Sequence, residues 1–481
     1  MPTISLDDPT AIGVSVVLRE LDGELAAVNL ETGRCFELDD ISRRMWALVG
    51  EHATFRAVLD RLCAEYDAPR ATLQTDLLHL VERLTSAKAE AAPRSRHVRD
   101  PVTMPAGPSV GRLRARLCEL LGARRADLPT AAEWNELVAC ARHDRVHLLL
   151  AAHLDATGRL RRCPPLIQHV LESALLDAAR REALQRHDLG RVIEALAAIG
   201  VVPVLLKGVP LSYTCYPQPH LRPSVDVDLL IRRADVGAVH HTMARLGYAR
   251  AHLIGGERVM HQFQYVTREP ATLALAYDFH WRIANPEVFA DVLSYEEIAR
   301  ETVSVPALGS HARTLSDVHA LLFACVHRVA HHDDADDLIW LYDIHLLAQR
   351  LTDDRWRDLA RVAGDRRMRA VCERSLARAS EAFGACMPPH IREAFADGGD
   401  EPSAVFLDGP LRQIDLQRSN FRHLRTWNAR WQFVRQHAFP APRYVLDAYE
   451  VSNRVWLPAL YVHRLLRGAV RWLRPARSRR V

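Results

Sequence analysis

The sequence lacks several features that would assign a chain of this size to a compartment or a cofactor class at once. Its nine cysteines include no Cys-x-x-Cys pair and no close cluster, which leaves zinc without a site and favours reduced thiols in the cytosol. No apolar run is long enough to cross a bilayer. Residues 1–5 show no basic region leading into an apolar core, so secretion is not expected. These absences predict a cytoplasmic chain without a transmembrane segment.

The length and the composition are those of an ordinary globular protein with more than one domain. At 481 residues the chain should form two or three domains, and its 48% hydrophobic and 25% charged residues are typical of soluble proteins. Changes in composition and periodicity predict an N-terminal domain over 1–92, a proline-rich linker over 93–110, a helical bracing segment over 111–200, a core with the candidate site over 201–305, a helical bundle over 306–400 and a basic, aromatic helical segment over 401–481.

Two aspartates one residue apart interrupt an otherwise apolar run over 225–231. Because alternate side chains of a strand face the same way, Asp226 and Asp228 should project side by side from one face. Ionised carboxylates in an apolar strand need compensation, and oxygen ligands of this kind suit Mg²⁺ together with a substrate phosphate. Short Asp-x-Asp patterns also arise by chance, and Asp226 could instead cap a turn or pair with Arg222.

The residues before this pair have the features of a phosphate-binding turn. The run 201–206 reads as a buried strand that leads into Lys207 and Gly208, and Pro210 is suited to the first position of a following helix. A strand, a tight turn and a helix N-terminus would offer free N–H groups to a phosphate, and Lys207 would add a point charge. Alternatively, Lys207 is a solvated charge at a helix end.

A second strand-like run follows the aspartate pair, over 273–281. Asp278 and His280 share one of its faces, whereas aromatic residues occupy the other. A third carboxylate would thus emerge from a well-packed sheet. Asp278 could also be a satisfied core carboxylate, and His280 could be a structural histidine or could orient a metal-bound water or a substrate hydroxyl.

Three short motifs, Leu205-Leu-Lys-Gly208, Arg222-Pro223 before the aspartate pair, and Asp278-Phe-His-Trp281, resemble the nucleotidyltransferase superfamily of the polymerase-beta type. They are most similar to a bacterial branch of uncharacterised nucleotidyltransferase-like proteins, over roughly residues 140–384. Superfamily members outside this branch have Gly-Ser in the phosphate turn, where this chain has Lys207-Gly208.

This resemblance implies a role for each residue of the candidate site. A nucleoside triphosphate, most simply ATP, would be bound with Mg²⁺ or Mn²⁺. The implied metal ligands are Asp226, Asp228 and Asp278; the implied nucleotide-binding residues are Lys207, Gly208 and Arg222; the implied catalytic residues are Asp278 and His280.

The N-terminal segment predicts a small domain of its own. Three short strands are expected over 14–18, 24–30 and 34–38, with turns at Asp22-Gly23 and Thr32-Gly33. Helical periodicity follows over 41–48, 55–66 and 73–84. The whole chain is therefore expected to be α+β, with an N-terminal winged-helix-like domain, then a nucleotidyltransferase-type mixed sheet flanked by helices, and a C-terminal helical bundle.

Residues 29–38, with Ile41 and Trp46, resemble the PqqD-type domain that recognises precursors of ribosomally made, modified peptides. The resemblance implies that a leader peptide adds as an extra strand to the sheet edge. The candidate peptide-binding residues are Leu30, Phe36, Leu38 and Trp46, which could also be core residues only. A winged helix can bind DNA, but acidic residues crowd the first half of this segment, so nucleic acid is not expected as a partner.

A long helical run opens after Ser316, its expected N-cap, and reaches Arg350. The resemblance implies that this run forms the acceptor side of a cleft, with His327 and Asp343 facing inward. Between them, the cluster over 331–337 is expected to be a solvated acidic turn between two helices. A second metal site there is disfavoured because adjacent residues on a helix point in different directions.

The chain ends in a basic and aromatic segment, with seven arginines between residues 464 and 480. A helix of this composition could lie on an anionic membrane or pack its apolar side on the bundle, and packing is the expectation. With a net charge of only +4 over the whole chain, any nucleic-acid patch would be local.

These features predict an enzyme of peptide natural-product biosynthesis, with lasso-peptide biosynthesis as one setting. The front domain would capture a precursor peptide, and the second would transfer AMP from ATP to a hydroxyl or carboxylate of that peptide. Other peptide-maturation enzymes are candidate partners. Three alternatives stay open: a non-catalytic adaptor, a kinase-like phosphotransferase, and a nucleotidyltransferase acting on nucleic acid.

Overall fold

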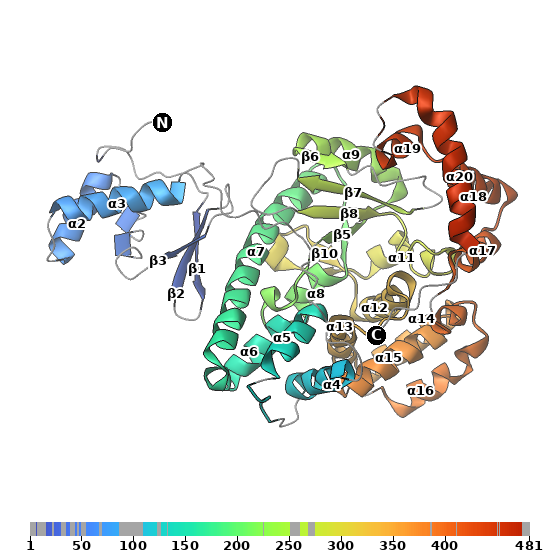
Figure 1. The fold of residues 1–481 in the computed structure, drawn as a ribbon, viewed down its shortest axis with the longest axis horizontal. Coiled ribbons are helices and arrows are strands. Elements are labelled where there is room, and N and C mark those ends of the chain that lie inside the picture. Colours follow the sequence, from blue (N-terminus) through green and yellow to red (C-terminus); the bar gives the residue numbers. More distant parts are fainter. Residues whose placement is uncertain are drawn as a thin grey trace. The chain divides into compact units, whose positions relative to one another are not determined.

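Two compact units make up the chain in a computed structural model (Figure 1), and each unit is described by itself. The first comprises Met1–Asp100, Ala179–His187 and Glu269–Ala274, and the second comprises Pro101–Ala178, Asp188–Arg268 and Leu275–Val481. The structure describes residues 6, 16–21, 24–29, 35–38, 44–45, 48–49, 54–66, 70–85, 109–122, 127–131, 133–224, 226–250, 260–267, 275–384, 387–409, 411–449, 451 and 453–473.

The first unit contains a three-stranded antiparallel sheet in the order β1-β2-β3, so that β1 and β3 are its edges. Its strands and helices are β1 (Val16–Leu21), β2 (Glu24–Asn29), β3 (Cys35–Leu38), α2 (Phe55–Glu65) and α3 (Arg70–Thr85). The hydroxyl of Thr54 caps α2 by accepting from the amide of Ala57. Leu59, Leu62 and Leu77 are fully buried between the helices. Three strands and two of the expected helices are confirmed, whereas both expected turns lie outside the described residues.

Helices fill the first part of the second unit, where the bracing segment was expected. They are α4 (Ser109–Leu121), α5 (Trp134–His143), α6 (His147–Ala156) and α7 (Pro165–Ala197), of which Ala179–His187 is counted with the first unit. Leu117, Leu137 and Leu150 are fully buried where α4, α5 and α6 meet, and full burial stabilises each by roughly 1.5–3 kcal/mol. Most of the expected linker lies outside the described residues, so the domain boundaries stay predictions.

A seven-stranded mixed sheet forms the centre of the second unit, in the order β6-β7-β8-β5-β4-β10-β9. Its strands are β4 (Val204–Leu206), β5 (Val227–Leu230), β6 (Tyr248–Arg250), β7 (Gln262–Thr267), β8 (Ala276–His280), β9 (Val303–Ser304) and β10 (Arg313–Thr314). β5 runs parallel to β8 and antiparallel to β4, while β10 runs parallel to β4. With β10, the sheet extends past residue 305, where the core was expected to end. The sequence does not predict this strand, because two residues are too few to show a periodic pattern.

Short helices connect the strands, and a helical bundle follows the last one. The connecting helices are α8 (Gly208–Thr214), α9 (Val236–Arg245), α10 (Glu287–Ala290) and α11 (Tyr295–Arg300). The bundle consists of α12 (Asp317–His332), α13 (Leu338–Arg350), α14 (Asp353–Asp365), α15 (Arg369–Phe383) and α16 (Pro389–Phe395). The 3₁₀ turns are η1 (Leu160–Arg162), η2 (Pro219–Leu221), η3 (Arg233–Asp235), η4 (Pro306–Leu308), η5 (Ala396–Asp400), η6 (Ala404–Leu407) and η7 (Arg454–Trp456). α12 packs against α13, α14 and α15 through buried residues such as Leu321, Val326 and Ile344, which fixes α12 beside the sheet.

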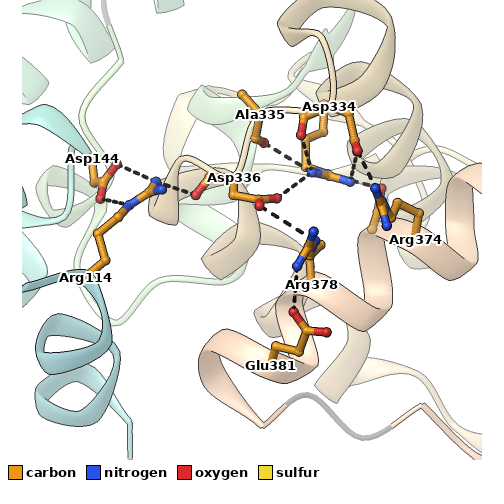
Figure 2. Close-up of polar contacts among 10 residues, drawn as sticks. Arg114, Asp144, Asp334, Ala335, Asp336, Arg374, Arg378 and Glu381 are labelled. Atoms are coloured by element: carbon orange, nitrogen blue, oxygen red, sulfur yellow. Dashed lines mark hydrogen bonds and ion pairs between the residues drawn. The ribbon is translucent and has the colours of Figure 1, made fainter. Parts of the chain in front are cut away.

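The acidic turn between α12 and α13 lies where it was expected but is only partly solvated, since Asp333 is exposed whereas Asp334 and Asp336 are half-buried beside an arginine. Arg328 of α12 is fully buried, and its guanidinium pairs with Asp334 and with Asp336 at 3.0 Å. It also donates to Ser375 Oγ at 3.2 Å, and Arg374 approaches Asp334 from α15 (Figure 2). The turn can fold back onto Arg328 because Asp333 and Asp334 both adopt left-handed backbone conformations, with φ of 51° and 55°.

Four further helices complete the chain, drawn in red in Figure 1: α17 (Gln413–His423), α18 (Trp427–Ala438), α19 (Pro442–Ala448) and α20 (Leu457–Leu473). α20 packs on α17 and α19, which belong to the same C-terminal segment, so packing on the bundle over 306–400 stays a prediction. This packing is incomplete, since Val462 and Leu465 of α20 remain 58% and 43% exposed. None of the described helices combines the length and the apolar character that crossing a membrane requires.

Candidate active site

Strand register brings the acidic residues of the two sequence motifs together. β5 and β8 are parallel neighbours, with Asp228 opposite Asp278 and Leu230 opposite His280. Because side chains two residues apart share a face, His280 and both carboxylates project from the same side of the sheet. One ligand atom from each of these three residues lies within 4.8 Å of the others. Asp226 does not lie within the strand as expected, but immediately before it, since β5 begins at Val227.

Lys207 reaches the same group from the neighbouring strand. Leu206 at the end of β4 pairs with Asp228, and Lys207 Nζ lies 2.7 Å from Asp228 Oδ1. Its backbone has φ 57° and ψ −133°, a conformation that favours glycine and costs a residue with a side chain roughly 1–3 kcal/mol. The chain thus keeps a glycine-like turn where related superfamily members are expected to have glycine, and adds an ammonium to it.

The residue at this turn is a lysine, which is rare in this chain. The chain has two lysines, Lys88 and Lys207, against 61 arginines. An ammonium is a compact point charge, whereas a guanidinium is a planar fork that needs more space. α8 begins directly at Gly208, so Pro210 is its third residue rather than its first, in the helix turn where a missing N–H removes no intrahelical bond.

Asp228 is buried and ionised between two donors. His280 Nε2 lies 2.8 Å from the oxygen that Lys207 also contacts, and Asp228 and His280 are 3% and 2% exposed. Burial raises the pKa of Asp228, but the Lys207 ammonium and the His280 hydrogen bond lower it more, so that the pKa lies well below its usual range. A fixed negative charge therefore stands at the centre of the group.

The other two carboxylates are less well compensated than Asp228. Burial and the nearby charge of Asp228 raise the pKa of Asp226 to about 6, and the same two causes raise that of Asp278. Asp278 Oδ1 is buried without a hydrogen-bond partner. A divalent cation would relieve both the repulsion and the orphaned oxygen, so these residues fit Mg²⁺ or Mn²⁺.

A cavity of about 370 Å³ opens in front of the carboxylates. This volume falls within the usual range for small-molecule sites. Lys207, Gly208, Asp226, Asp228 and Asp278 line one side, while α12 and α13 contribute the opposite side. The cavity therefore lies between the sheet edge and the helical bundle, where a substrate could meet the acids.

His327 lines this opposite side, and its acceptor-side role stays a prediction; His331 lines the cavity as well, which was not expected. His327 and His331 stack with ring centroids 5.1 Å apart, and both line the cavity. Burial lowers the pKa of His331 to about 3 and that of His327 well below its usual range, so both imidazoles are neutral. His331 Nε2 is buried without a hydrogen-bond partner. His327 and His331 therefore form part of the cavity wall.

Arg145 is a cavity residue that sequence reasoning missed. It lies between α5 and α6, in a left-handed conformation with φ 59°, and its guanidinium carbon lies 4.6 Å above the Trp340 ring. Burial and the charge of Arg222 lower its pKa. The only signal in the sequence is an arginine in a helical, arginine-rich segment, which does not distinguish it from its neighbours.

Two predicted site residues bind each other instead of facing an open cleft. Arg222 Nη2 lies 2.7 Å from Asp343 Oδ2, and Tyr216 donates to Asp343 Oδ1 at 2.6 Å. Both charged residues touch the cavity but are more than nine-tenths buried. This pair fixes the floor of the cavity next to Gly208, and the roles expected for Arg222 in nucleotide binding and for Asp343 on the acceptor side stay predictions.

Gly208→Ala is expected to destabilise the second unit by about 1–3 kcal/mol and to lower any transfer activity at least about ten-fold. A Cβ at this position would lie 2.4 Å from Arg222 Nη1 and 2.6 Å from Ser224 Oγ, so Arg222 would have to leave Asp343. Thermal and urea unfolding measure the first effect. The matched control is Gly237→Ala in α9, where nothing lies within 4 Å; equal stability of the two variants would contradict the clamped arrangement of Arg222.

The predicted peptide-binding residues belong to the first unit. Phe36 and Leu38 lie on β3, which is an edge of the sheet and so could accept an added strand. Leu30 and Trp46 lie outside the described residues. Peptide binding by these four residues therefore stays a prediction.

Comparisons with known families agree with both units. A family model described as "Coenzyme PQQ synthesis protein D (PqqD)" matches residues 24–89. A second, described as "Uncharacterised nucleotidyltransferase", matches residues 130–384, which is more than half of the chain. A comparison with curated proteins gave no match. The protein is thus a PqqD-like domain fused to a nucleotidyltransferase-like protein, and it belongs to the uncharacterised nucleotidyltransferase family.

Proposed function

We propose that the protein transfers a nucleotidyl group, most simply AMP from ATP, to a hydroxyl or carboxylate of a ribosomally made precursor peptide. The observation that carries this proposal is the convergence of Asp226, Asp228 and Asp278 with Lys207 at one cavity. Three carboxylates with one ammonium leave an excess of negative charge, which a nucleoside triphosphate can meet only with divalent cations. Membership of the nucleotidyltransferase family supports the same reaction class.

The residues present can divide the work of such a reaction. Asp226, Asp228 and Asp278 would hold Mg²⁺ or Mn²⁺, which when bound neutralises triphosphate charge and favours departure of pyrophosphate. Lys207, in the turn after β4, would contact a phosphate oxygen. Arg145 contributes a second positive charge from the opposite wall.

The chemical step needs an acceptor oxygen, a base and a leaving group. The acceptor oxygen of the peptide attacks the α-phosphorus of ATP, a new phosphorus–oxygen bond forms, and the bond to the β-phosphate breaks to release pyrophosphate. When the acceptor is a hydroxyl, the Asp278 carboxylate would accept its proton. An acceptor carboxylate brings no proton, and Asp278 then only orients it.

The PqqD-like unit supplies the peptide in this proposal. A leader peptide would pair as an additional strand with the edge strand β3 and so raise the local concentration of the acceptor. The backbone of an edge strand provides unpaired N–H and C=O groups along its length. Specificity would come from side chains beside that edge, where Phe36 and Leu38 stand in the sequence.

An assay of the full chain with ATP, Mg²⁺ or Mn²⁺ and a candidate precursor peptide tests the proposal. We expect the peptide mass to increase by one AMP residue, with release of pyrophosphate. A gain of one phosphate with release of ADP would identify a phosphotransferase instead. Peptide binding without any mass change in the presence of each nucleoside triphosphate would identify an adaptor and would refute the proposed transfer.

A further inference from the structure

Positive charge is concentrated at the C-terminal end of the chain. Residues 421–481 contain thirteen arginines, no lysine and two acidic residues, Asp447 and Glu450, which gives a net charge of +11. The whole chain carries +4, so the 420 residues before this segment carry −7. Such an asymmetry has no role in packing a helical bundle and indicates an anionic partner.

The same segment exposes large apolar side chains, which we call the C-terminal apolar surface. Among the described residues, thirteen large hydrophobic side chains are exposed, and eight of them lie in this segment. The eight are Trp427, Trp431, Val434, Phe439, Val455, Trp456, Val462 and Leu465. None of them lines the cavity of the candidate active site.

On α18 the exposed residues form one face. Trp427, Trp431 and Val434 are spaced by four and three residues and are 79%, 67% and 45% exposed. The opposite face of α18 is occupied, since Ala429 and Phe433 are buried against α17 residues. The helix is therefore packed on one side and presents two tryptophans on the other.

α20 continues this surface. Phe439 at the end of α18 is 56% exposed and contacts Tyr461 of α20, with ring centroids 5.6 Å apart. The Tyr461 hydroxyl donates to the Pro440 carbonyl at 2.7 Å, which ties the two helices together. Val462, the next residue, is 58% exposed. The C-terminal end of α18 therefore contacts α20 through Phe439 and Tyr461.

Arginine side chains stand beside two aromatic rings of this segment, those of Trp427 and Tyr444. The guanidinium carbon of Arg430 lies 5.3 Å from the Trp427 ring centre, and that of Arg464 lies 5.4 Å from the Tyr444 ring centre. Tryptophan and arginine together suit the headgroup region of a bilayer, where rings meet the acyl boundary and guanidinium groups meet phosphates. Exposed valine and leucine gain nothing from a nucleic acid but are buried when a helix lies in a lipid interface.

We propose that the C-terminal apolar surface binds the protein peripherally to a membrane rich in anionic lipids. α18 and α20 lie in the plane of the interface, with Trp427, Trp431 and Val462 in the acyl boundary and the arginines at lipid phosphates. Two signals act together here, apolar burial and charge, and each alone gives weak binding.

Flotation of the full chain with vesicles tests this proposal. We expect binding to vesicles of phosphatidylcholine mixed with phosphatidylglycerol, little binding to phosphatidylcholine alone, and weaker binding as sodium chloride is added. The variant Trp427→Ala/Trp431→Ala should bind the mixed vesicles at least about ten-fold more weakly, because it removes two large interfacial rings. Its melting temperature should stay near that of the unaltered chain, since both rings are mostly exposed.

Leu166→Ala is the matched control, because Leu166 is 67% exposed like Trp431 but lies at the start of α7, outside this surface. It should leave vesicle binding unchanged. Equal binding of the tryptophan variant and the unaltered chain, or equal binding to both kinds of vesicle, would overturn the proposal. Binding of a labelled RNA that is lost in the tryptophan variant, with no binding to either vesicle, would assign the surface to nucleic acid instead.

Discussion

The variant Asp226→Asn/Asp228→Asn is expected to lose nucleotidyl transfer by on the order of a thousand-fold or more. Both substitutions keep the shape of the side chain and remove its charge, so the cavity could no longer hold a divalent cation against a triphosphate. The rate of AMP addition to a bound peptide, followed by intact mass, measures the loss. Peptide capture should be unaffected, because the PqqD-like unit is unaltered.

The fold of the double variant should also survive, since the amide carbonyl that replaces the Asp228 carboxylate could still accept from Lys207 and His280. An aspartate that contacts the other face of β8 gives the matched control. Asp188 accepts a hydrogen bond of 2.6 Å from Tyr277, whose neighbour Asp278 faces the cavity. Asp188→Asn should lower the melting temperature and leave the transfer rate within about two-fold to three-fold. A double variant that transfers at the normal rate would end the proposed mechanism.

Arg328→Met is expected to destabilise the second unit by about 3–5 kcal/mol. Arg328 is fully buried and donates to the carbonyls of Asp334 and Ala335 as well as to the Asp334 and Asp336 side chains. Methionine fills a similar volume but donates nothing, so two carbonyls and two carboxylates would lose a buried partner. Urea unfolding measures the change in the free energy of unfolding.

Arg374→Met provides the comparison on the same network. Arg374 bonds Asp334 at 3.2 Å, but its side chain is 40% exposed, and a pair so open to water contributes about 1 kcal/mol or less (Figure 2). Equal losses in the two variants would show that Arg328 is no more than a surface ion pair in its effect. A much larger loss for Arg328 would show that the turn between α12 and α13 depends on it.

Strand alternation was sufficient to predict the centre of the site. Placing Asp278 and His280 on one face required only a period of two, and the register with Asp228 confirms that arrangement. The three expected strands of the first unit are confirmed for the same reason, since apolar alternation between turn residues is a local signal. Local signals of this kind depend on few neighbours, which is why a single sequence reveals them.

Features that depend on distant segments could not be predicted. Arg145 reaches the cavity through a left-handed turn between two helices, and nothing near it in the sequence distinguishes it from other arginines. Solvation is the natural expectation for the acidic turn, because its partner, Arg328, faces it only after α12 and α13 have folded together. Arg222 and Asp343 are 121 residues apart, so their pairing was likewise invisible. Lone charges in a sequence do not reveal their counter-ions.

The ammonium that Lys207 places on Asp228 changes how the cavity would be loaded. Without substrate, the most acidic carboxylate already has its own internal counter-ion, held by a turn whose backbone is costly to maintain. Under the proposed function, Asp228 would be freed to hold a cation once Lys207 has another partner, and a phosphate oxygen of the triphosphate would supply one. An idle site of this design keeps its most acidic carboxylate paired when nucleotide is scarce, which would couple cation capture to the arrival of the triphosphate.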